Sequence, residues 1–319
     1  MKSAEQHPPQ LVLKIDVDTY RGTREGVPNL VRMLQRHQAH ATFLFALGPD
    51  HTGRAMKRAL RPGFFSKVAR TSVVEHYGLK TLLYGVLLPG PDIGREAAIE
   101  MRSAHEAGFE CGIHTWDHVA WQDQVRGKDA DWTVRMMRHS AARYRHVFGI
   151  PAPTHGAAGW QMNDSAFAEL DAAGYRYASD GRAALQDNGA LRDPAMGPYR
   201  MAPGGAIQMP TTLPTLDELL GRTIDGVTLT ADNIAAHVLA LTADPVRDHV
   251  YTLHAELEGQ KLAPIFDQLL SGWQAQGYHL ASMADYHDRI KDLPLPLRRP
   301  GWGHVPGRSG ELIVPGAII

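Results

Sequence analysis

The sequence has too few cysteines for a disulfide framework and no apolar run long enough to cross a membrane. Its 319 residues include one cysteine, Cys111, which excludes intramolecular disulfides and fits a reducing compartment. No stretch approaches the ~18 consecutive apolar residues of a transmembrane helix. Residues 1–10 also lack the apolar core of a signal peptide. We therefore expect a cytoplasmic protein that meets a membrane only at its surface.

The chain also has no excess of charge of either sign. It carries 33 Lys and Arg against 34 Asp and Glu, a formal net charge of −1, which predicts no general attraction to nucleic acid. Hydrophobic residues make up 44% of the chain, enough for a sizeable core. The length allows one large domain or two average ones.

Hydrophobic patterning predicts alternating strands and helices. Residues 11–18 alternate apolar and polar side chains, as a strand does, and residues 41–47 form a second, almost wholly apolar strand. A helix with Pro28 near its start lies between them. A further strand is expected over 109–113. This rhythm predicts an α/β fold built from parallel βα units.

Residues 48–94 interrupt the rhythm and are too long for a plain loop. Between His51 and Lys80 only Glu75 opposes seven basic residues, which are Arg54, Lys57, Arg58, Arg61, Lys67, Arg70 and Lys80. Apolar residues lie between them, so we expect a partly helical, basic insertion. It is either a helical excursion with a solvated face or an amphipathic patch on the anionic inner-membrane surface. Nucleic acid ranks third, because no reading motif is present.

The two ends of the chain are expected to be flexible. Proline and glycine dominate from Leu293 onward, and we predict flexible segments over 1–10 and 292–319. The catalytic domain is expected to span 11–291.

Polar side chains recur where the expected strands end. His114 and His118 are spaced i, i+4, which on a helix would place both imidazoles on one face, within reach of one ion. The pair alone is weak evidence, since 17 histidines could give this spacing by chance. Asp16 and Asp18 share one face of their strand about 6.5–7 Å apart, where they repel each other unless a positive group lies nearby.

Two later strand ends add Ser179-Asp180 and His254 with Glu256. Closing parallel strands into a barrel would gather all four ends on one face. Two histidines and one aspartate with open coordination positions suit a catalytic divalent metal.

With these motifs the chain resembles the polysaccharide deacetylase family. Asp16-Val17-Asp18 matches the paired aspartates of that family, His114-Thr115-Trp116-Asp117-His118 its His-Ser/Thr-x-x-His motif, and Leu253-His254 its late leucine–histidine motif. The resemblance covers residues 11–290. It implies a distorted (β/α) barrel and metal-dependent hydrolysis of an amide on a sugar.

Longer segments resemble one branch of that family, the bacterial enzymes that deformylate 4-formamido-arabinose carried on phosphoundecaprenol. They are residues 15–28, 114–122, 157–160, 213–215 and 254–259. This resemblance implies a lipid-linked sugar substrate, work at the cytoplasmic face of the inner membrane, and a role in lipid A modification and polymyxin resistance.

The resemblance also implies roles for single residues. Asp18, His114 and His118 would bind a divalent metal, Zn²⁺ or another ion, with Asp16 as general base and His254 as general acid. A backbone N–H at Gly159-Trp160 would stabilise the oxyanion.

Weaker expectations concern substrate contacts, for which the candidates are Arg21, Arg24, Gly159, Trp160, Asp180, Arg182 and Glu256. Glu256 would orient His254 or contact the sugar. Arg21 and Arg24 would grip the lipid phosphate, although an ordinary surface pair fits them nearly as well.

One family motif is missing. The arginine–proline–aromatic segment is replaced by Ala157-Ala158-Gly159-Trp160, so the arginine that would orient the base aspartate is absent. Arg182, beside Asp180, is a candidate substitute.

Three other functions fit parts of this pattern. The first is N-deacetylation of peptidoglycan or a chitin-like polymer, although such enzymes are usually exported. The second is a non-catalytic protein that binds a sugar or lipid, against which the intact set of metal and acid–base residues argues. The third is a general amidohydrolase barrel, which would normally carry His-x-His where this chain has aspartates. The sequence leaves the oligomeric state open.

Overall fold

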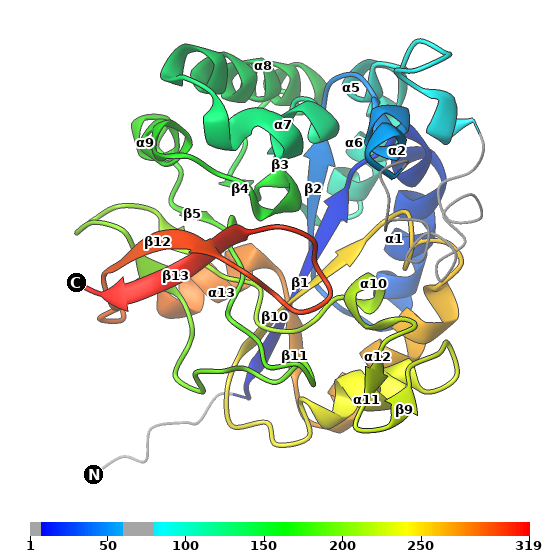
Figure 1. The fold of residues 1–319 in the computed structure, drawn as a ribbon, viewed down its shortest axis with the longest axis vertical. Helices are drawn as coiled ribbons and strands as arrows, with labels where there is room; N and C mark the ends of the chain where they lie inside the picture. Colours follow the sequence, from blue (N-terminus) through cyan, green and yellow to red (C-terminus); the bar gives the residue numbers. More distant parts are fainter. Residues whose placement is uncertain (1–7, 60–79) are drawn as a thin grey trace.

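The computed structural model describes residues 8–59 and 80–319, and a curled, largely parallel sheet forms its centre (Figure 1). The strand order is β10-β1-β2-β3-β4-β5-β7-β6, and β11 also pairs with β1. The strands are β1 (Gln10–Val17), β2 (Thr42–Ala46), β3 (Glu110–Thr115), β4 (Thr154–His155), β5 (Tyr177–Ala178), β6 (Tyr199–Arg200), β7 (Ile207–Gln208), β10 (His249–His254) and β11 (His279–Ala281).

Strand β1 pairs in parallel with three strands, β2, β10 and β11. Its four alternating apolar residues, Leu11, Leu13, Ile15 and Val17, are fully buried in the main core. The expected alternation is therefore confirmed. The polar face is buried too, because it faces the interior of the curled sheet: Lys14 is 0% exposed and Asp16 3%.

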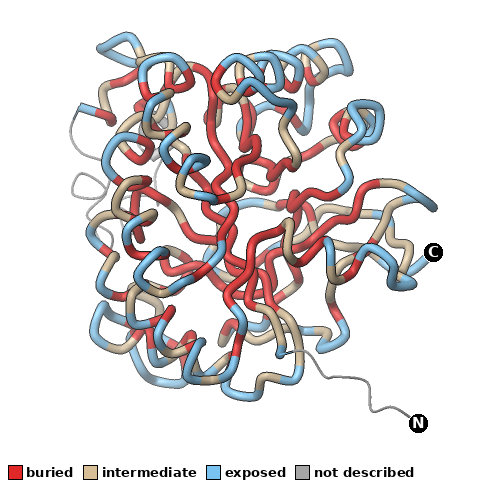
Figure 2. Tube along the Cα trace, turned by 180° about the vertical axis from the view of Figure 1, so that it is seen from behind, coloured by how far each residue is buried: buried red, intermediate tan, exposed pale blue. Residues whose placement is uncertain are grey.

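The sheet curls far enough for its two sides to meet. The Thr212 N–H, just after β7, donates to the Val250 carbonyl of β10 at 2.9 Å. The predicted α/β class with a distorted (β/α) barrel is confirmed. Figure 2 shows the buried strands at the centre and the exposed outer faces of the helices around them.

The larger helices cover the outside of the sheet. Capping residues fix the ends of two of them. Asn163 caps one of them by accepting a hydrogen bond from the Ala166 N–H, and Gly149 ends another at φ 76°. These helices are α1 (Val27–Arg36), α6 (Ala98–Glu106), α8 (Ala130–Phe148), α9 (Asp164–Ala172), α11 (Ile234–Ala240), α12 (Ala263–Ala275) and α13 (Met283–Ile290). No helix within 8–59 and 80–319 is long and apolar enough to cross a membrane.

The expected basic insertion is described only at its two ends. It begins with α2 (Thr52–Ala59), and after the gap a short 3-10 turn, η2 (Thr81–Leu83), leads to α5 (Ile93–Glu96). Residues 60–79, which carry several of its basic side chains, lie outside the described residues. Its amphipathic character stays a prediction.

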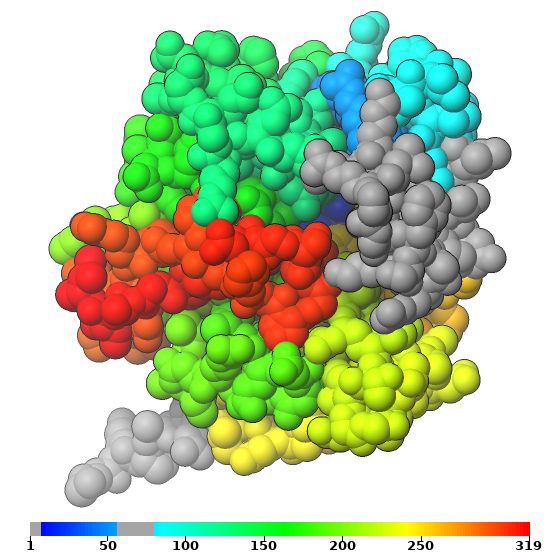
Figure 3. Space-filling view, viewed as in Figure 1, coloured from blue at the N-terminus to red at the C-terminus, as the bar shows by residue number. Residues whose placement is uncertain are grey.

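The expectation of a flexible C-terminal segment is wrong for residues 298–318. They form an antiparallel hairpin of β12 (Arg298–Gly303) and β13 (Leu312–Ile318), which lies across the front of the barrel (Figures 1 and 3). The Arg182 N–H donates to the Ile313 carbonyl at 2.8 Å, and Val305, Leu312 and Ile313 are buried. The proline- and glycine-rich composition hid these apolar anchors. At the other end, β1 already begins at Gln10.

Two substitutions in β13 test how firmly this hairpin packs. Ile313→Ala should lower the free energy of unfolding by about 2–4 kcal/mol, since Ile313 is 4% exposed and its truncation leaves a cavity. Ile318→Ala, in the same strand but 64% exposed, should change it by less than about 0.5 kcal/mol. Urea unfolding measures both. Equal effects would contradict the packed hairpin.

Candidate metal centre

The carboxyl ends of β1, β3 and β10 open into a cavity of about 180 Å³. Its wall combines strand ends with loops that are distant in sequence. The lining residues are Asp16, Asp18, His114, His118, Gln122, Gly159, Trp160, Asp217, His254, Leu257 and Arg308. The five residues expected to carry the chemistry therefore lie together.

Asp18, His114 and His118 form a cluster suited to one metal ion. Their ligand atoms lie within 4.8 Å of one another. The Asp18 Oδ1 is 3.2 Å from His114 Nε2, and its Oδ2 is 3.4 Å from His118 Nε2. No other such cluster occurs in the parts of the chain that the structure describes.

The two histidines do not share a helical face, as the spacing suggested. His114 lies in β3, whereas His118 is the first residue of α7 (His118–Gln124). Asp117 caps that helix by accepting from the Ala120 N–H at 3.0 Å. The strand-to-helix turn brings the two rings to a centroid distance of 5.3 Å. The expectation of a shared helical face is therefore wrong, because the strand-to-helix turn brings His114 and His118 together.

The cluster is prepared to receive a cation. The His114 Nδ1 donates to the Gly156 carbonyl at 2.7 Å, which leaves Nε2 for a metal. Burial raises the pKa of Asp18, but the nearby His118, His114 and His254 outweigh it and hold that pKa well below its usual range. Burial lowers the pKa of His118, whereas at His114 burial is outweighed by the nearby Asp16 and Asp18, which raise the pKa. An ionised carboxylate and neutral imidazoles are the forms that bind metal.

Asp16 lies beside this cluster, and its two carboxylate oxygens have different surroundings. Its Oδ2 is 3.4 Å from Lys14 Nζ. Its Oδ1 is buried and has no hydrogen-bond partner among the described residues. Lys14 was not identified from the sequence as a site residue. Its place on the same strand face as Asp16 and Asp18 could have identified it.

His254, at the end of β10, is held by acidic neighbours. Its backbone N–H donates to Glu258 Oε2 at 2.9 Å, and its ring Nδ1 lies 4.0 Å from Asp217 Oδ1. Asp217, in the short helix α10 (Leu216–Leu219), pairs in turn with Arg308 at 3.1 Å. The sequence analysis missed both residues, because α10 and the C-terminal hairpin carry no motif.

Three expected substrate contacts are not in the cavity wall. Arg182 is fully buried and forms a two-pronged ion pair with Glu218, so it does not replace the missing family arginine. Asp180 accepts hydrogen bonds from His155 at 2.7 Å and Gln208 at 2.9 Å.

Glu256 is the third of these residues. Its Oε1 accepts from the Asp18 and Thr19 N–H groups at 3.0 and 2.8 Å. It therefore fixes the loop that carries Asp18 and does not orient His254.

Gly159 and Trp160 do line the cavity, in a turn of positive φ. A Cβ on Gly159 would lie 2.7 Å from Gln122 Cγ, so glycine is required there. The Trp160 N–H already donates to the Ala157 carbonyl at 3.0 Å. Of the two expected oxyanion donors, this leaves the Gly159 N–H.

Arg21 and Arg24 lie outside the catalytic cavity, in a neighbouring pocket of about 560 Å³. Tyr20, Lys80 and Tyr84 are among its other lining residues. Both arginines pair with carboxylates, Arg21 with Glu25 at 2.9 Å and Arg24 with Glu100 at 3.0 Å.

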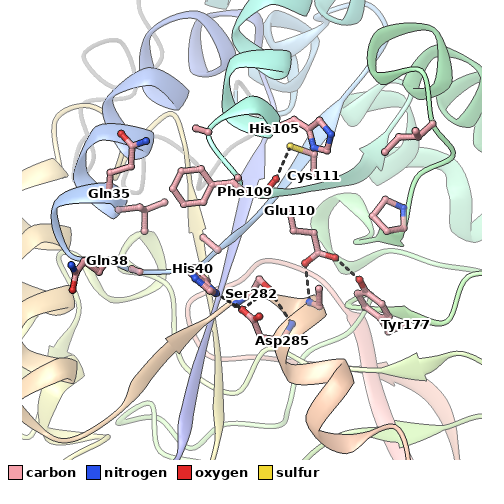
Figure 4. A pocket seen from close by; sticks show the side chains of 18 of the residues that line it. Gln35, Gln38, His40, His105, Phe109, Glu110, Cys111, Tyr177, Ser282 and Asp285 are labelled. Carbon is pink, nitrogen blue, oxygen red and sulfur yellow. Dashed lines mark hydrogen bonds and ion pairs between the residues drawn. The ribbon is translucent and has the colours of Figure 1, made fainter.

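A larger cavity of about 860 Å³ lies at the amino ends of the strands (Figure 4). Its buried carboxylate, Glu110, accepts hydrogen bonds from Thr42, Tyr177 and the Ala284 N–H. Burial also raises the pKa of the Cys111 thiol there, which keeps it protonated. Glu110 is thus paired and Cys111 protonated, so neither of these two groups is poised for catalysis.

Comparisons with known proteins identify relatives of this chain. The sequence profile of the family described as polysaccharide deacetylase matches residues 4–178. A protein of Shewanella sediminis assigned as 4-deoxy-4-formamido-L-arabinose-phosphoundecaprenol deformylase is 35% identical over 97% of this chain and 95% of its own length. A protein of Wigglesworthia glossinidia brevipalpis with the same assignment is 29% identical over 93% of this chain and 99% of its own length.

One solved structure supports the fold. It is that of a polysaccharide deacetylase assigned in Mycobacterium smegmatis, with a TM-score of 0.61 at 14% identity, covering 95% of this chain and 97% of that one. At this identity the likeness concerns the fold alone.

The ligand set can be tested by removing one imidazole. His118→Ala should weaken Zn²⁺ binding by at least about 100-fold, because loss of a direct ligand exceeds the effect of changing its supports. His146→Ala, an exposed histidine on α8, should bind as the wild type does. Calorimetric titration of the metal-free proteins measures both. Native affinity in His118→Ala would contradict the proposed cluster.

Proposed function

The chain belongs to the polysaccharide deacetylase family, and from this premise we propose that it deformylates 4-deoxy-4-formamido-L-arabinosyl-phosphoundecaprenol. The products would be formate and the free 4-amino sugar lipid. The observation that carries this proposal is the meeting of Asp16, the Asp18–His114–His118 cluster and His254 at one cavity. The substrate comes from the two relatives assigned as deformylases.

The metal cluster would hold Zn²⁺ or another divalent ion. Such an ion, bound by Asp18, His114 and His118, would lower the pKa of a water toward ~7 and stabilise negative charge on the formyl oxygen. Only this part of the chemistry depends on the ion, and the remaining steps use side chains of the protein.

Asp16 is the general base in this proposal. Asp16 lines the cavity, and its carboxylate would accept one proton as the water oxygen attacks the formamide carbon. The Gly159 N–H lines the same cavity and would donate to the developing oxyanion.

His254 is the general acid. An amine cannot leave as an anion, so the C–N bond breaks only as the nitrogen receives a proton, which His254 would supply. The Asp217 Oδ1 lies 4.0 Å from the Nδ1 of this imidazole. Water thus gives its oxygen to formate, and the amine gains a proton.

The pocket beside the cavity would receive the phosphate of the lipid carrier. Arg21, Arg24 and Lys80 line it, and the first two follow Asp18 by three and six residues in the same loop. Guanidinium groups recognise phosphate oxygens well. Phosphate would compete with Glu25 and Glu100 for them.

The substrate lipid would place the enzyme at the cytoplasmic face of the inner membrane, where basic side chains favour anionic headgroups. The amino sugar would then serve lipid A modification and polymyxin resistance. The alternative from the same family is N-deacetylation of an amino-sugar polymer. It needs the same metal and acid–base residues but a different acyl group.

The substrate is tested by product identity. Purified, metal-loaded protein incubated with the formamido-arabinosyl lipid should release one formate per amino sugar, seen as a loss of 28 mass units, the calculated mass of the CO removed on deformylation. An N-acetylated amino-sugar oligomer should release little acetate. Acetate release without formate release would establish the deacetylase alternative.

The phosphate pocket can be tested by removing one guanidinium group. Arg24→Gln should raise KM about three- to tenfold with little change in kcat, because the contact lies away from the reacting carbon. Arg135→Gln, an exposed arginine on α8, removes the same charge elsewhere and should leave both constants unchanged. Steady-state kinetics of formate release separates the two. A loss of kcat alone in Arg24→Gln would contradict a phosphate-binding role.

A further inference from the structure

We propose that Lys14 is a positioning residue, which fixes the orientation of the Asp16 carboxylate for proton transfer. This inference rests on the proposed function and assigns it a further residue. Lys14 does not line the catalytic cavity, so it acts through Asp16.

The first observation is that Lys14 is a fully buried cation with few partners. Its side chain is 0% exposed. The Nζ lies 3.4 Å from Asp16 Oδ2, donates to the Ser179 carbonyl at 3.1 Å, and is 5.3 Å from the centre of the Trp160 ring. Burying a charge is costly unless it is paired, and these groups are its compensation.

The second observation is that a glycine in the loop after β4 leaves space for the Lys14 side chain. A Cβ on Gly156 would lie 2.9 Å from Lys14 Cε and 2.4 Å from Leu44 Cδ1. Gly156 also accepts the hydrogen bond that orients His114. One loop position therefore accommodates the lysine and holds a proposed metal ligand.

The third observation is the asymmetry of Asp16. Lys14 approaches only Oδ2, while Oδ1 is without a hydrogen bond in the described part of the molecule. His114 Nδ1 is 3.7 Å from Oδ1 but already donates to Gly156. Rotating the carboxylate would break the ion pair, so the pair fixes the orientation of the Asp16 carboxylate.

A merely structural ion pair would behave differently. Replacing a buried pair with apolar groups often leaves stability unchanged or improved, so stability alone does not identify the role. If Lys14 acts through Asp16, removing its charge should matter only while Asp16 can act as a base. A double-mutant cycle separates these cases.

The cycle compares the wild type with Lys14→Met, Asp16→Asn and the double variant. Methionine keeps the length of the buried stem but carries no charge. Lys14→Met should lower kcat about 10- to 100-fold, a part of the 10²–10⁴-fold effect of a general base, with KM changed less than twofold. In the Asp16→Asn background the same change should alter kcat less than about twofold.

Two further measurements accompany the kinetics. Zn²⁺ affinity by calorimetry should stay within about threefold in all four proteins, because Lys14 touches no proposed ligand. Thr252→Val is the matched control: Thr252 is paired with Lys14 across β1 and β10 and is equally buried, but it bonds Thr211. Its kcat should match the wild type.

Several outcomes would overturn the proposal. They are an unchanged kcat in Lys14→Met, an equal loss in both backgrounds, or a matching loss in Thr252→Val. If Lys14→Met does not fold, the double variant, which removes both charges, is compared with Asp16→Asn, and a more than tenfold difference in kcat would equally overturn it. Wild-type turnover of the formamide against the acetamide tests the proposed function separately, and the cycle then uses whichever amide is cleaved.

Discussion

The site depends on the parallel pairing of β1 with the strands around it. Because β1 pairs with β10 and β2 over its carboxyl half, its end is fixed beside the ends of β10 and, through β2, of β3. Alternation then places Lys14, Asp16 and Asp18 on the interior face. A slip of one residue would turn all three outward and bring apolar side chains into the cavity.

This arrangement gathers charges that must be balanced inside the barrel. Asp16 and Asp18 would repel each other if both were ionised without positive partners. Lys14 lies beside Asp16, and the imidazoles of His114 and His118 lie beside Asp18. Lys14 thus lies on one side of the pair and the candidate metal ligands on the other. The different roles that we propose for the two aspartates follow from these different neighbours.

Local patterns predicted the parts of the site that lie on strands, and they failed where distant segments meet. Alternation in β1, the histidine motif and the late leucine–histidine motif were enough to expect the five central residues. The shared helical face was wrong, because the turn between β3 and α7, not helical periodicity, brings His118 to His114. Arg182 seemed a substitute cation from its place beside Asp180, but its partner Glu218 lies 36 residues away in sequence.

The C-terminal hairpin shows the same limit more strongly. Its composition resembles a tail, yet it supplies Arg308, which lines the cavity and pairs with Asp217 opposite His254. Proline and glycine shape its turns, while a few apolar residues such as Ile313 anchor it to the barrel. Displacing the hairpin would take Arg308 away from Asp217, so the hairpin couples the folding of the chain end to the electrostatics around His254, the proposed general acid. Composition cannot reveal such coupling, because it exists only once both segments are folded.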